Sequence, residues 1–251
     1  MISRSESLAG RVALVTGATG GIGSAICRSL AAAGARVAVA YRHDAEAAEA
    51  LARSLPGPDH AWFQADITES AQLDRLAAEI TRRYGTVDVL VNCAGTTRFV
   101  PHADLDGLDD ALIDDIFRTN WRGPFATLRA LRPRLARDGG GVVINKSSIS
   151  AMSGTGSNVA YCASKAALNT MTVSLARALA PAVRVLSICP GLVDTDFIAG
   201  LDPAWRQEQV ARTPLGRLTR PDEIGEAVVA AATLTAATGT TIVIDGGRLL
   251  A

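Results

Sequence analysis

This chain of 251 residues is poor in histidine, cysteine and long apolar runs, and each scarcity argues against a class of protein. Its three histidines (His43, His60 and His102) form no cluster, and its four cysteines are scattered without paired spacing. The sequence therefore predicts neither a metal site nor a Ser-His-Asp site. No apolar run reaches the roughly 18 residues that a membrane span needs, so we expect no membrane partner.

The chain also lacks an excess of charge of either sign. Its 25 basic residues balance its 25 acidic residues, and its pI is about 6.8, so nothing indicates a nucleic-acid or anionic-membrane surface. The polar start, Met1 to Ser7, does not have the pattern of a signal peptide. Scattered cysteines are typical of reduced, buried thiols. Together these features predict a cytoplasmic protein.

Short apolar segments alternate with amphipathic ones along the chain. The expected strands lie at 11–16, 36–41, 61–65, 87–92, 141–147, 183–189 and 240–244. The expected helices lie near 21–34, 44–55, 69–84, 105–137, 158–180 and 221–235. This alternation is typical of a parallel sheet covered on both faces. We expect one α/β domain over 1–251, a doubly wound Rossmann fold with a seven-stranded parallel sheet, an N-terminal tail over 1–9 and substrate-side loops and helices over 194–212.

A glycine-rich turn follows the first expected strand and leads into a helix. It reads Thr16-Gly17-Ala18-Thr19-Gly20-Gly21-Ile22-Gly23. Such a turn presents backbone N–H groups to a pyrophosphate, and the helix N-terminus adds partial positive charge. A plain structural turn is the alternative. Its place in the first strand-to-helix connection favours dinucleotide binding.

The end of the second expected strand bears on the choice of nicotinamide cofactor. An acidic residue there would hold the adenosine ribose and repel a 2′-phosphate. This chain has Tyr41-Arg42-His43 instead. Because a guanidinium binds phosphate well, Arg42 favours NADPH and NADP⁺ over NADH. The alternative is that Arg42 only caps or solvates the loop.

Tyr161 and Lys165 stand four residues apart on an expected helix. This spacing places both side chains on one helix face, where an ammonium group favours the tyrosinate form of a phenol. Only two of the 25 basic residues are lysines, Lys146 and Lys165. Lysine supplies a compact point charge that arginine does not reproduce. An exposed Tyr/Lys pair without chemistry is the alternative.

The order and spacing of these motifs, from Arg11 to Gly247, resemble the single-domain branch of the short-chain dehydrogenase/reductase family. Besides the glycine turn and the Tyr161/Lys165 pair, the marks are Asp66-Ile67, Asn92-Cys-Ala94-Gly95, Asn120, Ser148, Pro190-Gly191-Leu-Val193-Asp-Thr195, Pro214-Leu-Gly-Arg217, Pro221-Asp-Glu-Ile224, Thr238-Gly239 and Asp245-Gly246-Gly247. The nearest group is similar to the 3-oxoacyl-(acyl carrier protein) reductases.

The resemblance implies a role for four catalytic residues. Tyr161 would be the general acid that protonates the substrate oxygen, and Lys165 would assist it and hold the nicotinamide ribose. Ser148, thirteen residues before Tyr161, would orient the carbonyl oxygen. Asn120 would hold a water that links Lys165 to solvent.

The resemblance also implies a set of cofactor-binding residues. Asp66 and Ile67 would meet the adenine, Asn92, Ala94 and Gly95 would line the adenosine side, and Val193 and Thr195, after the turn at Pro190-Gly191, would grip the carboxamide. The full expected set is Gly17, Thr19, Gly20, Gly21, Ile22, Gly23, Tyr41, Arg42, Asp66, Ile67, Asn92, Ala94, Gly95, Tyr161, Lys165, Pro190, Gly191, Val193 and Thr195. Asp66 as a cap of the next helix and Asn92 as a tie between strands are the alternatives.

Two positions depart from the family's pattern. Lys146 precedes the Ser147-Ser148 pair, where the family has a small or apolar residue, and a lysine on a buried strand needs an acidic partner or a path to solvent. Gly20 lacks the basic side chain that supports NADPH preference in relatives. Arg42 is thus left to make the phosphate contact.

The loops beyond the strand ends, at 96–104, 150–158 and 194–212, are expected to choose the substrate. They carry the apolar side chains Phe99, Met152, Phe197, Ile198, Leu201 and Trp205. We therefore expect reduction of an apolar ketone or 3-oxoacyl thioester. The arginines Arg129, Arg132, Arg134 and Arg137 would dock an acyl carrier protein or form a solvated helix face.

Other functions stay open at this point. An NAD-dependent alcohol or polyol dehydrogenase is the first alternative, and a non-catalytic scaffold that senses the dinucleotide is the second. An enoyl reductase is disfavoured, because that branch resembles a Tyr/Lys pair with wider spacing. The resemblance further implies a homotetramer, with a homodimer as the alternative.

Overall fold

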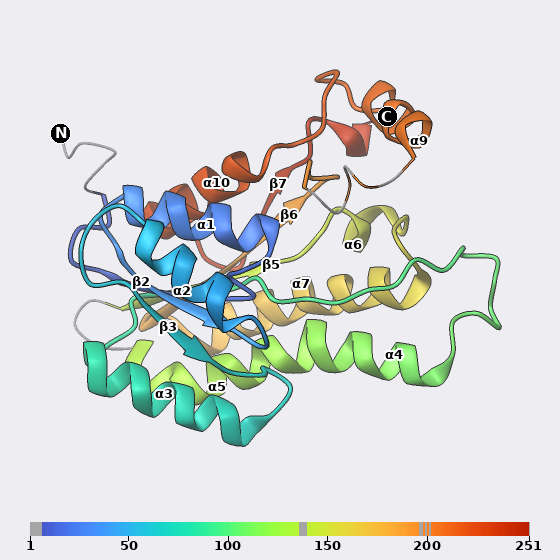
Figure 1. Ribbon diagram of the computed structural model, residues 1–251. Helices are drawn as coiled ribbons and strands as arrows, with labels where there is room; N and C mark the ends of the chain where they lie inside the picture. The colour runs from blue at the N-terminus through green and yellow to red at the C-terminus, as the bar shows by residue number, and fades with distance from the viewer. Residues whose placement is uncertain (1–6, 136–139, 196–197, 199, 201, 251) are drawn as a thin grey trace.

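The computed structural model describes residues 7–135, 140–195, 198, 200 and 202–250. Seven strands form one parallel sheet in the order β3-β2-β1-β4-β5-β6-β7 (Figure 1). They are β1 (Val12–Thr16), β2 (Arg36–Tyr41), β3 (Ala61–Gln64), β4 (Val89–Asn92), β5 (Gly141–Lys146), β6 (Val183–Pro190) and β7 (Thr241–Ile244). The order reverses between β1 and β4, which confirms the doubly wound parallel sheet predicted from the sequence.

Helices cover both faces of this sheet (Figure 1). On one face, α1 (Gly21–Ala32), α2 (Ala45–Ser54) and α10 (Pro221–Thr233) bury apolar side chains against the strands. On the other face, α3 (Ser70–Tyr84), α5 (Gly123–Leu135) and α7 (Val159–Leu179) do the same. Because both faces are covered, β1 and β4 are buried along their whole length, as their apolar sequences require.

The expected helix over 105–137 is wrong as one continuous element. The structure has α4 (Asp110–Phe117), a π-helical turn η2 (Arg118–Arg122) and then α5. The carboxylate of Asp109 accepts from the Leu112 N–H at 2.8 Å, so α4 begins five residues later than expected. Pro124 has no N–H to donate to the carbonyl of Asn120, which breaks the α-helical pattern at η2.

Short elements complete the carboxyl edge of the sheet. These are α6 (Ser150–Ser153), α9 (Pro203–Ala211) and the 3₁₀ turn η3 (Arg248–Leu250). The helix α9 lies within the region 194–212 that the sequence assigns to substrate-side loops and helices. No helix in the described ranges is long and apolar enough to span a membrane. Nor do those residues contain a group of three or more potential metal ligands.

Candidate active site

A cavity of about 620 Å³ runs along the carboxyl ends of β1 to β5. It lies at the point where the strand order reverses, where ligands bind in sheets of this kind. Its lining residues are Thr16, Gly17, Thr19, Gly20, Gly21, Ile22, Gly23, Ala40, Tyr41, Arg42, His43, Asp44, Ala65, Asp66, Ile67, Cys93, Ala94, Gly95, Thr96, Thr119, Lys146 and Thr195. The cavity therefore brings together most of the residues that the sequence assigns to cofactor binding.

Two glycines of the turn leave no room for a side chain. Gly17 has a φ of +63°, and a Cβ there would lie 2.7 Å from the Ala94 Cα. A Cβ on Gly23 would lie 2.2 Å from the Gly17 carbonyl oxygen. Gly20 is the N-cap residue of α1 and supplies no side-chain cap, so N–H groups of the first turn remain available to a ligand. The turn fits a pyrophosphate.

Thr16 joins this turn to the end of β4. Its hydroxyl oxygen accepts from the N–H groups of Cys93 and Ala94 at 3.2 and 3.3 Å and donates to the Val91 carbonyl at 3.4 Å. The side chain is almost fully buried. Thr16 thus fixes the Ala94-Gly95 segment against the glycine turn.

Arg42, Asp44 and Asp66 line the end of the cavity beside β2 and β3. The Arg42 guanidinium is exposed, and its Nη1 lies 4.0 Å from Asp66 Oδ2. Asp66 accepts at 2.8 Å from both the N–H and the hydroxyl of Thr68, so it holds a turn before α3 and is not the helix cap. Burial raises the pKa of Asp66, but the hydrogen bonds from Thr68 and the charge of Arg42 outweigh it and hold that pKa below its usual value.

Tyr161 and Lys165 lie on α7 at the other end of the site. Lys165 Nζ lies 5.7 Å from the centre of the Tyr161 ring and donates to the Lys146 carbonyl at 3.0 Å. Lys165 is only 1% exposed. Burial lowers the pKa of Lys165 to about 7, and the charge of Lys146 adds to the effect. The lysine therefore changes charge near neutral pH, beside the phenol.

Asn158 fixes the start of α7 and with it the position of Tyr161. Its side-chain oxygen accepts from the Tyr161 N–H at 2.7 Å as the helix N-cap. Its amide nitrogen donates to the Arg98 carbonyl at 2.7 Å and to the Thr97 hydroxyl at 3.2 Å. The residue is completely buried. An asparagine directly before a helix was the available sequence signal for this role.

The two serines after β5 differ in their contacts. The Ser147 hydroxyl donates to the Lys165 carbonyl at 3.1 Å and ties β5 to α7. The Ser148 hydroxyl donates to Ser150 Oγ and accepts from the Ser150 N–H, both at 3.1 Å. Ser148 is thus held by Ser150, a contact that the sequence did not indicate. The Ser148 hydroxyl thus donates one hydrogen bond and accepts another, and both are local contacts with Ser150.

Asn120 lies in the π-helical turn η2 and is completely buried. Its Oδ1 accepts from the Thr96 N–H at 2.8 Å, and its Nδ2 donates to the Thr96 carbonyl at 3.0 Å and to Ser164 Oγ at 3.1 Å. The side chain therefore joins η2, the loop after β4 and α7. Its placement beside Lys165 is compatible with the expected relay, although its amide group is used by protein contacts.

Asn92 is expected to contact the cofactor, but it faces the interior of the sheet. Its Nδ2 donates to Asn145 Oδ1 at 2.9 Å, and Asn145 donates to Thr172, whose hydroxyl bonds that of Ser187 at 2.9 Å. This chain of buried polar side chains joins β4, β5, α7 and β6. Asn92 does not line the cavity, and the contacts favour its alternative role as a tie between strands.

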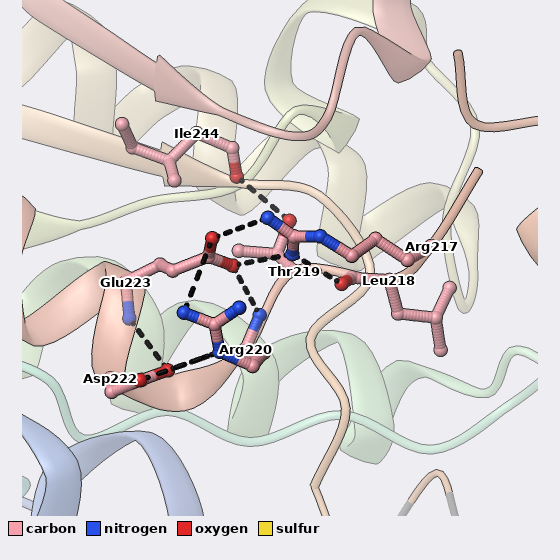
Figure 2. Close-up of polar contacts among 7 residues, drawn as sticks. All are labelled: Arg217, Leu218, Thr219, Arg220, Asp222, Glu223 and Ile244. Carbon is pink, nitrogen blue, oxygen red and sulfur yellow. Dashed lines mark hydrogen bonds and ion pairs between the residues drawn. The ribbon is translucent and has the colours of Figure 1, made fainter. Parts of the chain in front are cut away.

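The segment after β6 is held by a network around Glu223. Arg217 donates to both Glu223 oxygens, at 2.6 and 2.9 Å, and the Arg220 N–H donates to Glu223 Oε2 at 2.8 Å (Figure 2). The Thr219 between these arginines accepts from the Asp194 N–H at 2.8 Å and donates through its own N–H to the Leu192 carbonyl at 3.2 Å. The network therefore positions the segment Leu192–Thr195.

Val193 and Thr195 take different places in this segment. Val193 is buried and forms a bridge with Thr219. Thr195 lines the cavity, with its Cγ2 lying 3.0 Å from the point where Gly21 would carry a Cβ. Pro190 ends β6, and the Gly191 N–H donates to the Ile244 carbonyl at 3.0 Å, so both of these residues shape the turn rather than line the cavity.

We expect Glu223→Gln to remove a pH-dependent part of the stability. Hydrogen bonds from Arg217 and Arg220, assisted by their charges, lower the pKa of Glu223 to about 2 from its usual 4.5. A depressed folded-state pKa stabilises the fold above the unfolded value, and this stabilisation disappears as the pH falls towards 2. Urea unfolding between pH 7 and pH 2.5 should show a shallower loss for the variant than for the wild type.

Glu226→Gln is the matched control, since Glu226 is an exposed carboxylate on the same helix. It should unfold with the pH dependence of the wild type. Equal slopes for Glu223→Gln and the wild type would contradict the assignment.

The apolar substrate-side residues do not gather into one described pocket. Phe99 is 74% exposed, Met152 and Trp205 are also exposed, and Ile198 is buried. Phe197 and Leu201 lie outside the described residues. The loops 96–104 and 150–158 are joined, because the Val100 N–H donates to the Ser157 carbonyl at 2.8 Å.

Sequence reasoning missed several residues of the site. His43, Asp44, Cys93, Thr96 and Thr119 line the cavity beside the expected residues. Asp44 also caps α2 by accepting from the Ala47 N–H at 2.8 Å, and this capping position was readable from the sequence. The others lack a local signal, since only the fold brings them to the cavity.

A doubly wound sheet with this glycine turn, and with the half-buried Tyr161 one helical turn before the buried Lys165, defines the class of nicotinamide-dependent oxidoreductases that act on CH–OH and C=O groups. Comparison with known proteins supports the class. The family model described as "Enoyl-(Acyl carrier protein) reductase" matches residues 17–248. The chain belongs to the short-chain dehydrogenase/reductase family.

Relatives within the family act in both chemical directions, as their names state. The chain is 40% identical over 245 residues to a protein named as ketoacyl reductase 2 of the granaticin polyketide synthase of Streptomyces violaceoruber, covering 95% of this chain and 96% of that one. It is 36% identical over 251 residues to cis-4-hydroxycyclohexanecarboxylate dehydrogenase of Sinomonas cyclohexanicum, covering 96% and 98%.

A solved structure has the same fold. It is described as a short-chain dehydrogenase/reductase, glucose/ribitol dehydrogenase, from Brucella melitensis. Its TM-score is 0.90 at 31% identity, and the match covers 97% of this chain and 98% of the other.

Proposed function

We propose that this protein reduces a ketone, a 3-oxoacyl thioester or a similar apolar carbonyl, to the secondary alcohol with NADPH, and that Tyr161 is the general acid. The observation that carries the proposal is the buried Lys165 beside Tyr161, with Nζ 5.7 Å from the ring centre. Neither residue lines the cavity, but Lys165 Nζ donates at 3.0 Å to the carbonyl of Lys146, which does line it, and Arg42 lines its other end. One site thus offers a proton donor and a phosphate-binding cation.

The glycine turn, Arg42 and Thr195 are the residues that would hold the dinucleotide, which supplies a hydride when bound. The chain's own residues orient and protonate the carbonyl oxygen of the substrate. Tyr161 gives its proton to that oxygen, while Ser148 donates a hydrogen bond and orients it. Lys165 stabilises the phenolate that remains, because its ammonium lies on the same helix face. Asn120 and its buried contacts hold the loop after β4 against α7.

The preference for NADPH rests on Arg42. Its guanidinium is exposed and lines the cavity. Asp66 Oδ2 lies 4.0 Å from Arg42 Nη1, which is too far for a hydrogen bond, so the guanidinium can still bind the 2′-phosphate of NADPH. Asp44 lines the same end and would oppose a phosphate, but its carboxylate is engaged in capping α2. The balance favours NADPH, and an NAD-dependent alcohol dehydrogenase is the competing function.

The proposal includes a cytoplasmic homotetramer. Trp121 and Phe125 stack with ring centres 6.1 Å apart on the exposed side of η2 and α5, which supports a contact between subunits. An acyl carrier protein finds fewer free cations than expected. Arg129 bonds Ser70, Arg134 bonds Thr81, and Arg137 lies outside the described residues. Light scattering with size-exclusion chromatography tests the oligomer.

The experiment that tests the function is NADPH oxidation with a panel of ketones led by an acetoacetyl thioester. NADH, a secondary alcohol with NADP⁺ and a crotonyl thioester serve as parallel arms. Turnover of the ketone with NADPH supports the proposal. Turnover of the crotonyl thioester alone would favour the enoyl reduction named by the family model, and tight cofactor binding without any turnover would favour a sensing scaffold.

A further inference from the structure

Lys146 is a cation inside the cavity that has no anionic partner among the described residues. It ends β5, is half-buried and lines the cavity with Gly95, Thr96 and Thr119. Its carbonyl accepts from Lys165 Nζ, while its own ammonium makes neither an ion pair nor a hydrogen bond within the part of the chain described. A charge held so close to the protein interior needs a counter-charge from a ligand or from water.

Lys165 is a second cation beside Lys146 and increases the need for a counter-charge. A Cβ built on Gly95 would lie 3.9 Å from Lys146 Nζ and 3.6 Å from Lys165 Nζ, so both ammonium groups face the same small region. Like charges repel, and the charge of Lys146 adds to burial, the larger cause, in lowering the pKa of Lys165. The other titratable groups that face the pair are Cys93 and Cys189, and burial raises the pKa of both thiols. No carboxylate among the described residues forms an ion pair with either lysine.

The acidic residues of the cavity cannot compensate. Asp44 and Asp66 line the end beside β2 and β3, whereas Lys146 ends β5, on the far side of β1 and β4. Asp44 is bonded to the Ala47 N–H, and Asp66 to Thr68. Positive charge therefore gathers where Lys146 and Gly95 line the cavity, and the first turn of α1, which lines the same cavity without a side-chain cap, also favours an anion.

We propose that Lys146 is a further dinucleotide-binding residue, whose ammonium group donates to an anionic oxygen of the pyrophosphate from the β5 side of the cavity. The inference rests on one part of the proposed function, the binding of a nicotinamide dinucleotide, and does not depend on the reduction of a ketone. The glycine turn offers neutral N–H donors to the pyrophosphate, and Lys146 adds a full positive charge to the lining of the same cavity. Lys146 thus binds the pyrophosphate, which NADP⁺ and NAD⁺ both contain, whereas Arg42 binds the 2′-phosphate, which of the two only NADP⁺ contains.

Equilibrium binding measured by titration calorimetry separates these two roles. The Lys146→Met variant should bind NADP⁺ and NAD⁺ about 10–100-fold more weakly than the wild type, the effect of one lost charge-assisted hydrogen bond. It should bind adenosine 2′-monophosphate, which has no pyrophosphate, within about twofold of the wild type. Lys146→Arg, which keeps the charge, should recover most of the affinity. Arg42→Met is the matched control and should weaken NADP⁺ and adenosine 2′-monophosphate but not NAD⁺.

Two results would overturn the assignment. Unchanged NADP⁺ and NAD⁺ affinity in Lys146→Met, with ketone turnover reduced, would place the lysine at the substrate. Equal weakening of all three ligands, with a lower Tm for the free protein, would show a structural role. Because every arm measures binding, a protein that reduces no ketone at all would refute the proposed function and leave this test intact.

Discussion

Tyr161→Phe is expected to lower kcat for ketone reduction by about 10²–10⁴-fold, the usual contribution of a general acid. The change removes one hydroxyl and leaves the ring, which lies 5.7 Å from Lys165 Nζ. The Tyr161 N–H bond to Asn158 is a backbone contact and is unaffected. Affinity for NADPH should therefore stay within about twofold of the wild type, and the loss should fall on kcat.

Stopped-flow measurement of NADPH oxidation, with cofactor binding followed separately, checks this result. Tyr84→Phe is the matched control, since the Tyr84 hydroxyl donates to the Asp59 carbonyl at 3.0 Å and Tyr84 does not line the cavity. That variant should keep the wild-type kcat. A Tyr161→Phe protein that turns over ketones at the wild-type rate would remove Tyr161 from the mechanism.

Arg42→Asp is expected to reverse the cofactor preference, changing the ratio of kcat/KM for NADPH to that for NADH by about 10²-fold or more. The substitution removes the cation that would bind a 2′-phosphate and places a carboxylate beside Asp66. A carboxylate at this point accepts hydrogen bonds from the ribose hydroxyls of NADH and repels the phosphate of NADPH. Steady-state kinetics with both cofactors gives the ratio.

Arg42→Met separates the two effects of that substitution. It should weaken the use of NADPH without improving the use of NADH, because it removes the cation and adds no acceptor. A ratio in Arg42→Asp that equals the wild-type ratio would show that Arg42 only solvates the loop. The phosphate-binding role would then have to lie elsewhere in the cavity lining, with His43 as the neighbouring candidate.

The sheet and the glycine turn were predictable because their signals are local. A buried strand must be apolar, and a turn with Gly17 at φ +63° and Gly23 against a carbonyl admits only glycine. The helix break near Asn120 was not predicted, although Pro124 was visible, because the apolar pattern of 105–137 continues across it. The Asp109 cap fixes where α4 begins, and Pro124 interrupts the α-helical pattern at η2.

The polar contacts of the site were less predictable for a different reason. Asn92 and Asn145 carry no mark of each other, since the partner is chosen by strand register, and the Ser148–Ser150 contact depends on the local turn after β5. The sequence singled out Lys146 as unusual, but only the structure shows that Lys165 faces the same region. Contacts between distant segments are set by the fold, so they could not be predicted from a single sequence.

The hydroxyl of Thr16 accepts from the N–H groups of Cys93 and Ala94, residues that follow it by 77 and 78 positions. The glycine turn and the Ala94-Gly95 segment therefore come together only after β1 has paired with β4, and β2 and β3 are already synthesised between these two strands. Such distant parallel pairing closes a long loop and is slow to form during folding. In refolding from urea, the ability to bind a dinucleotide should therefore return in the slowest phase, well after the helical signal has recovered. Binding in an early phase would mean that the glycine turn and the Ala94-Gly95 segment come together before the sheet forms.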